Sequence, residues 1–194
     1  CELKDRKVGI SVFDYRTGLP DNIVKRVHAQ ADGLWLGTED SGILQFDPIS
    51  GKVTPMIAGQ WKYGAFTDFL PDEDQVWISS QQNGLILHDR TNGASRIFNA
   101  LAGAGFTTTL TLAKDREGNI WAGTKTDVMR SRGDQLEFID RFDPLQETNT
   151  IAVAIDPGGS TWFSTGEGLF RRSVDANGKA TIDRPLSGSP YPEH

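Results

Sequence analysis

The chain has 194 residues, with 20 Lys and Arg against 26 Asp and Glu, and a net charge of −6. No basic run is present, so the electrostatic footprint of a nucleic-acid-binding protein is missing, and no apolar run approaches the roughly 20 residues of a transmembrane helix. The 21 glycines and nine prolines are typical of a turn-dense all-β protein.

Cys1 is the single cysteine, which excludes an internal disulfide. A cysteine at this position has two interpretations. It can be the lipidated first residue of a mature bacterial lipoprotein, which would anchor the domain outside the cytoplasm, or it can mark a mere segment boundary. Only the residues in front of Cys1 would decide between them, so both interpretations stay open.

Residues 8–15 (VGISVFDY) alternate between apolar and polar side chains and predict one strand, followed by a turn at 17–20. This strand precedes the first full unit of the chain. We expect it to be the outermost strand of a preceding sheet, or a strand that closes a ring by joining the last sheet and so removes exposed edges.

The next stretch, residues 18–54, predicts a four-stranded meander. Its strands are expected at 23–29, 34–38 and 43–47, with a fourth that starts at Lys52. Gly, Asp, Asn or Pro stands at every junction, which is typical of tight connections between strands.

Three further units follow the same plan. Their strands are expected at 65–70, 75–79, 85–88 and 95–98; at 108–113, 120–123, 128–131 and 136–139; and at 150–155, 161–164, 169–172 and 180–182. The Pro-, Ser- and Gly-rich tail carries no strand signal and is expected to be a linker or a frayed end.

One tryptophan marks each unit. Trp35, Trp77, Trp121 and Trp162 follow one another at intervals of 42, 44 and 41 residues, and each opens a similar run: WLGTEDSGIL, WISSQQNGLI, WAGTKTDVMR and WFSTGEGLFR. A period near forty with four strands per unit predicts the blades of a β-propeller. The blades are expected at about 22–57, 64–98, 107–142 and 149–183.

Four blades are few for a ring, because propellers have four to eight. The chain could close as a small ring, belong to a longer polypeptide, or pair with a second copy. An open arc would leave both end blades with a bare face. We therefore expect either a piece of a larger ring, which is the favoured interpretation, or an arc that self-associates through its end blades.

The pattern GLPDNIVKRV, DGLWLGT, SGILQFD and GKV resembles the two-component regulator propeller repeat, and the resemblance covers residues 18–182. It implies the extracytoplasmic sensor portion of a bacterial receptor, with seven blades joined to a membrane helix and a cytoplasmic output domain. The chain departs from the family in having too few repeats. Its third copy also has Thr126-Asp127-Val128 where the family has Gly-Gly, which indicates an altered corner.

A ligand is expected where the loops entering the first strands and the corners between second and third strands meet, because every blade contributes there. The mixed amide, hydroxyl, acidic and aromatic groups suit a small polar ligand or an oligosaccharide. The candidate residues are Asn22, Glu39, Asp40, Trp61, Tyr63, Gln81, Gln82, Thr108, Lys125, Asp127, Asn149 and Glu167.

The four periodic tryptophans are expected to pack between blades. The hydroxyls of Thr38, Ser80, Thr124 and Thr165, three residues after each tryptophan, are expected to bind turn backbone groups. Trp61 breaks the period in a polar loop, where it would serve surface recognition or pack locally over a blade edge.

Catalytic patterns are weak. The histidines have no metal-ligand spacing, and no nucleophile elbow or phosphate-binding loop occurs. We expect no cofactor, no metal and no nucleic-acid partner. The leading hypothesis is a non-catalytic sensor propeller on the periplasmic or extracellular side of a bacterial membrane, acting with the rest of a receptor chain or a second copy. The alternatives are a protein-interaction scaffold and a propeller lyase that uses His28 on a first strand.

Overall fold

The computed structural model describes residues 10–57, 64–99, 108–132, 135–141 and 149–185. Within these ranges the chain forms sixteen strands in four antiparallel sheets of four, and no helix is present. In each sheet the strands are adjacent in the order in which they follow along the chain. The predicted all-β architecture of four-stranded blades is confirmed.

The strands have the following bounds. Blade 1 contains β1 (Val24–Gln30), β2 (Gly33–Thr38), β3 (Ile43–Phe46) and β4 (Val53–Pro55); blade 2 contains β5 (Phe66–Asp72), β6 (Gln75–Ser80), β7 (Gly84–Asp89) and β8 (Ser95–Phe98). Blade 3 contains β9 (Thr109–Lys114), β10 (Ile120–Thr124), β11 (Val128–Arg132) and β12 (Gln135–Arg141); blade 4 contains β13 (Thr150–Ile155), β14 (Thr161–Thr165), β15 (Gly168–Val174) and β16 (Ala180–Asp183).

Local chemistry explains where the outer strands turn. In blades 1 and 2 the connection between third and fourth strand begins at Asp47 or Asp89, whose carboxylate accepts the backbone N–H two residues later at 2.9 and 2.8 Å. It ends at Gly51 or Gly93, with φ of +72° and +73°. Glycine adopts this left-handed conformation without strain, so the chain reverses in five residues.

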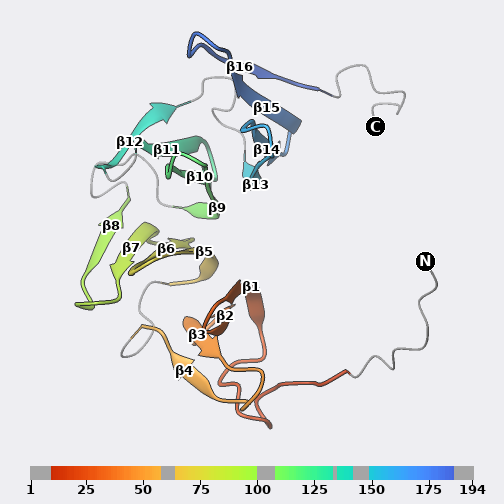
Figure 1. Ribbon diagram of the computed structural model, residues 1–194, viewed down its shortest axis with the longest axis vertical. Coiled ribbons are helices and arrows are strands. Elements are labelled where there is room, and N and C mark those ends of the chain that lie inside the picture. Colours follow the sequence, from red (N-terminus) through yellow and green to blue (C-terminus); the bar gives the residue numbers. More distant parts are fainter. Residues whose placement is uncertain (1–9, 58–63, 100–107, 133–134, 142–148, 186–194) are drawn as a thin grey trace, which may run out of the picture.

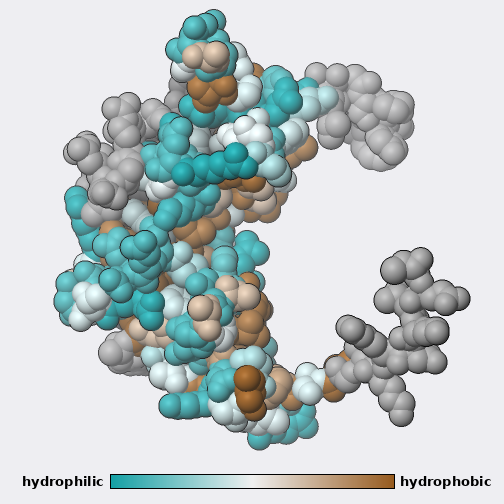
Figure 2. Space-filling model, viewed as in Figure 1, coloured by the Kyte–Doolittle hydropathy of each residue, from teal (hydrophilic) through white to brown (hydrophobic). Residues whose placement is uncertain are grey.

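The four blades form an open arc (Figure 1). The first strands β1, β5, β9 and β13 lie along the concave side, and β4, β8, β12 and β16 lie on the convex side. Hydrophobic residues reach the surface mainly along the concave side, whereas the convex side is mostly hydrophilic (Figure 2).

Most of the core lies between neighbouring blades, and one further cluster lies on blade 1. Trp35 packs with residues of blade 2, Trp77 with residues of blade 3, and Trp121 with residues of blade 4. These three side chains are at most 3% exposed, which confirms their predicted packing role. Trp162 is half-buried, because it lies on the outer face of the last blade.

The predicted strand at 8–15 is wrong for its described part, residues 10–15, which form no strand. The residues alternate between apolar and polar side chains, but they pair with none of the four sheets. Instead Phe13 packs edge-on against Phe46 with ring centroids 4.7 Å apart. Together with Leu19, it covers part of the outer face of blade 1. The predictions made for Cys1, Trp61, Tyr63 and the tail after residue 185 lie outside the described residues.

Candidate ligand site on the concave face

A β-bulge recurs in the first strand of every blade. The pairing with the second strand skips one residue between Val24 and Arg26, and at the same place in β5, β9 and β13. The extra residues are Lys25, Thr67, Leu110 and Ile151. A bulge takes a residue out of the regular alternation and redirects its side chain.

These four bulge residues line one hollow of about 500 Å³ on the concave face. Phe66, Gln81 and Asn149 complete its lining. The bulges occupy equivalent positions in the four blades, so their residues lie on one surface. The first and last of them, Lys25 and Ile151, are more than 120 residues apart in the sequence. We call this surface the concave hollow.

The side of the hollow built by blades 1 and 2 is polar and held in place by contacts between blades. The Lys25 ammonium donates to Glu39 Oε1 at 3.0 Å and to the Phe66 carbonyl of the next blade at 3.2 Å. The Thr67 hydroxyl donates to the Thr109 carbonyl at 2.7 Å. These hydrogen bonds therefore hold the Lys25 ammonium and the Thr67 hydroxyl in one position.

The side built by blades 3 and 4 is apolar. Leu110 is half-buried, and Ile151 is 55% exposed although it is a large aliphatic residue. Asn149, which is also exposed, adds an amide beside Ile151. The hollow thus offers an aliphatic surface next to hydroxyl, amide and ammonium groups. This combination suits a ligand with a non-polar face and a hydroxylated edge.

One backbone bond recurs in all four blades and joins the corner after the second strand to the loop that enters the first. It runs from Glu39 N to Ile23 O (3.0 Å), from Gln81 N to Ala65 O (3.0 Å), from Lys125 N to Thr108 O (3.4 Å) and from Gly166 N to Asn149 O (3.3 Å). The corners and entering loops therefore share one rim, as expected.

The structure divides the predicted site residues into three groups. Gln81 and Asn149 line the hollow directly. Glu39 and Thr108 do not line the hollow but contact residues that do. Glu39 accepts from the Lys25 ammonium, and the Thr108 hydroxyl donates to the Gln81 carbonyl at 2.8 Å. The remaining described candidates lie on the rim outside the hollow: Asn22, Asp40, Gln82, Lys125, Asp127 and Glu167.

Two of these rim residues use their side chains for local structure. Asn22 Oδ1 accepts the Tyr15 N–H at 2.9 Å, and Gln82 Oε1 accepts the Ala65 N–H at 2.6 Å. Such bonds order the entering loops. Sequence patterns did not predict five lining residues, because they indicate regular first strands and a site on loops. These residues are Lys25, Phe66, Thr67, Leu110 and Ile151.

The hydroxyls that follow the tryptophans bind turn backbone groups, as predicted. Thr38 Oγ1 donates to the Gly42 carbonyl at 2.8 Å, and Thr124 Oγ1 to the Asp127 carbonyl at 2.9 Å. Ser80 Oγ accepts the Asn83 N–H at 3.2 Å, and Thr165 Oγ1 accepts the Glu167 N–H at 3.1 Å.

His28 does not line the concave hollow. It pairs with Trp35 across β1 and β2, and its ring packs edge-on against Phe69 of blade 2, with centroids 4.7 Å apart. A general base must reach its substrate, and this side chain points between two blades. In the described part of the chain, no group of three or more His, Cys, Asp or Glu residues could hold a metal ion, and no helix could span a membrane.

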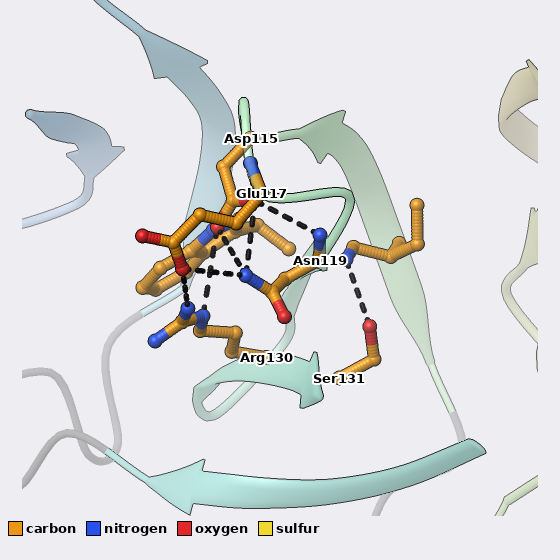
Figure 3. A network of polar contacts seen from close by, with 7 residues as sticks. Asp115, Glu117, Asn119, Arg130 and Ser131 are labelled. Atoms are coloured by element: carbon orange, nitrogen blue, oxygen red, sulfur yellow. Dashed lines mark hydrogen bonds and ion pairs between the residues drawn. The ribbon is translucent and has the colours of Figure 1, made fainter. Parts of the chain in front are cut away.

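The opposite end of the blades carries a structural polar network (Figure 3). Asp115 Oδ2 accepts the Trp121 indole N–H at 2.9 Å and lies 3.6 Å from Arg130 Nε, while Oδ1 accepts the Asn119 N–H. Burial alone would raise the pKa of Asp115, but Asn119, Trp121 and Arg130 together hold the pKa below its ordinary value. The same carboxylate–indole bond joins Asp156 to Trp162 at 2.9 Å.

Comparison with solved structures identifies the fold. The extracellular domain assigned to the hybrid two-component system BT4673 of B. thetaiotaomicron matches 84% of the chain at a TM-score of 0.64 and 22% identity. A streptogramin B lyase structure matches 88% of the chain at a TM-score of 0.64 and 13% identity. The chain has a β-propeller fold, and its four sheets are blades.

The propeller segment spans 23% of the BT4673 domain and 57% of the lyase chain. An auxiliary nutrient binding protein from Bacteroides thetaiotaomicron also matches, over 83% of the segment and 41% of its own length, at a TM-score of 0.58 and 12% identity. The sensor domain among these matches agrees with the resemblance to two-component regulator repeats. No family model and no curated protein matches the chain.

Proposed function

We propose that this propeller segment is the ligand-binding part of an extracytoplasmic sensor in a bacterial signalling receptor, and that it is not an enzyme. The ligand is a small polar metabolite or an oligosaccharide that occupies the concave hollow. The observation that carries the proposal is the β-bulge repeated in β1, β5, β9 and β13. A bulge interrupts strand pairing, and four aligned bulges that supply one shared hollow are explained by recognition better than by folding.

The chemistry of the hollow supports a carbohydrate-like ligand. The apolar CH face of a sugar ring fits over Leu110 and Ile151, and its hydroxyls can bind Asn149 and Thr67. Lys25 already contacts Glu39 and a carbonyl, so it adds a donor rather than an unsatisfied positive charge. Neutral oligosaccharides are therefore preferred to strongly anionic ligands.

The resemblance to a two-component sensor domain and to a nutrient binding protein adds support for the receptor context. Under this proposal the segment works together with further receptor domains, including a membrane segment and a cytoplasmic output domain. The sequence of the whole polypeptide checks this part. A gene product without a membrane segment or an output domain would contradict the receptor role and leave the binding role intact.

Ligand binding is tested by thermal-shift screening of neutral and acidic oligosaccharides and polar metabolites, followed by calorimetry. We expect at least one neutral ligand to raise Tm. Ile151→Asp and Asn149→Ala should then weaken its affinity by about tenfold or more, which corresponds to ~1.4 kcal/mol. The matched controls are Ile49→Asp and Asn177→Ala, which change exposed residues in strand connections away from the hollow.

Two results would contradict the proposal. Binding of a macromolecule, with no response to any small molecule, would favour the protein-interaction scaffold. Turnover of a bound ligand would indicate an enzyme, and turnover that persists in His28→Ala would also remove the one catalytic candidate that the sequence offers.

A further inference from the structure

The dipeptide Asn-Gly occurs three times in the chain, at 83–84, 92–93 and 177–178. In such a pair the glycine backbone nitrogen can attack the side-chain Cγ of the asparagine, because glycine has no Cβ to hinder the approach. A five-membered succinimide ring forms and ammonia leaves, and water then opens the ring to aspartate or isoaspartate. The reaction consumes one water and releases one ammonia, without an enzyme or an oxidant. Asparagine is therefore a thermolabile residue.

Two of these asparagines lie in matching turns. Asn92 connects the third and fourth strands of blade 2, and Asn177 connects those of blade 4; both are exposed. In each turn the N–H of the following glycine donates to the carbonyl of the aspartate that opens the turn, Asp89 at 2.9 Å and Asp175 at 3.0 Å. The attacking nitrogen is thus restrained to the same degree in both turns.

The side chains of these two asparagines differ in their hydrogen bonds. Asn92 Nδ2 donates to Asp89 Oδ2 at 3.0 Å, and Asn92 Oδ1 accepts the Ala94 N–H at 2.8 Å. The Asn177 side chain makes no hydrogen bond with the described residues; only its backbone N–H is bound, to Asp175 Oδ1 at 2.9 Å. Ring closure requires the side chain to rotate toward the glycine nitrogen. Asn92 must therefore first lose two hydrogen bonds that Asn177 does not have.

The third asparagine, Asn83, lies in the corner between β6 and β7 and is half-buried. Its backbone N–H donates to Ser80 Oγ at 3.2 Å, and no group in the described part of the chain bonds its side chain. Gln81 of the same corner lines the concave hollow. Conversion of Asn83 would therefore add a carboxylate next to the candidate ligand site, and the isoaspartate product would also lengthen the main chain of this corner by one carbon.

We propose that Asn83 and Asn177 are sites of spontaneous deamidation in the folded protein, and that the two side-chain hydrogen bonds of Asn92 protect it from the same reaction. The modification does not depend on the proposed function. Only its consequence at Asn83 rests on that function: the new negative charge disfavours acidic ligands of the concave hollow more than neutral ones.

Mass spectrometry of the folded protein, incubated at mildly alkaline pH and sampled over several weeks, tests the proposal. Trypsin separates the three asparagines into the peptides 63–90, 91–96 and 173–179. A gain of about 1 Da marks each conversion. We expect Asn177 and Asn83 to convert about tenfold or more faster than Asn92, because the hydrogen bonds of Asn92 must break first. In protein kept unfolded in urea, the three rates should approach one another.

A pair of variants tests the protection directly. Asp89→Ser removes the acceptor of Asn92 Nδ2 and should raise the rate at Asn92 by about two- to tenfold. Asp175→Ser is the matched control and should leave the rate at Asn177 near that of the parent, since Asp175 does not hold that side chain. Circular dichroism verifies the fold of each variant.

Three results would overturn the proposal. They are equal rates at Asn92 and Asn177 in the folded protein, a rate at Asn83 as low as that at Asn92, and an Asn92 rate that stays the lowest by the same factor in urea. If Asp89→Ser does not fold, the comparison of folded and unfolded parent protein still decides. A protein that deamidates as expected but binds no ligand would contradict the proposed function alone.

Discussion

Asp68 of β5 joins three blades through one carboxylate. Its Oδ1 lies 2.9 Å from Arg26 Nε in blade 1, and its Oδ2 accepts the Leu112 N–H of blade 3 at 2.9 Å. Asp68 is 5% exposed and directly follows the bulge residue of its strand. The carboxylate therefore fixes the spacing of the first strands from which the concave hollow is built.

Replacing Asp68 by Ala should lower the free energy of unfolding by about 2–4 kcal/mol. The change leaves the Leu112 N–H buried without its acceptor and removes a charge-assisted bond. Arg26→Ala should cost less, about 0.5–1 kcal/mol, because Arg26 is 44% exposed. Urea denaturation monitored by tryptophan fluorescence measures both. Equal losses in the two variants would contradict the bridging role of Asp68.

Gly123 of blade 3 lies directly against Thr150 of blade 4. A Cβ at this position would lie 2.7 Å from Thr111 Cγ2 and 2.9 Å from the Thr150 carbonyl oxygen. Gly123→Ala should therefore destabilise the protein by about 1–3 kcal/mol through overpacking. Gly166→Ala is the control, because nothing lies within 4 Å of its added Cβ. Thermal unfolding compares the variants, and a stable Gly123→Ala protein would show that the two blades can separate.

Acid should destabilise the blades through the carboxylates at their turns. The pKa of Asp115 is lowered although burial opposes this, and the Trp162 indole N–H and the Ser160 backbone lower the pKa of Asp156. Groups with a lowered folded-state pKa stabilise the protein fully above their unfolded value, near 3.8. That contribution is lost as pH falls through the folded-state pKa.

Unfolding measured between about pH 7 and pH 2.5 should therefore show a plateau and then a steep loss below about pH 4. Asp115→Asn should be less stable than the parent on the plateau and should lose less stability in acid. Asp74→Asn serves as a control, since Asp74 is exposed in the turn between β5 and β6. Parallel curves for Asp115→Asn and the parent would show that other carboxylates control acid unfolding.

The sequence predicted the blades well because each depends on short-range signals. Aspartates and glycines place the turns, and each tryptophan marks the second strand, so the expected strand bounds agree with the observed ones to within two residues. The strand expected at 8–15 failed because alternation describes a strand but does not supply a partner. Lys25 and Thr67 were missed for a related reason: a bulge arises from how two strands pair, and neither strand alone encodes it.

The extra residue in each first strand can contact a ligand without also having to pair with the neighbouring strand. A residue in the regular ladder must fit its cross-strand neighbours, whereas a bulge residue lies outside that register. The four bulges hold an ammonium, a hydroxyl and two aliphatic groups on one repeated backbone. Leu110 and Ile151, which make no polar contacts, can be exchanged most freely. Substitutions at these two positions, in evolution or in a combinatorial library, should therefore change which ligand binds while the thermal stability of the protein stays near that of the parent.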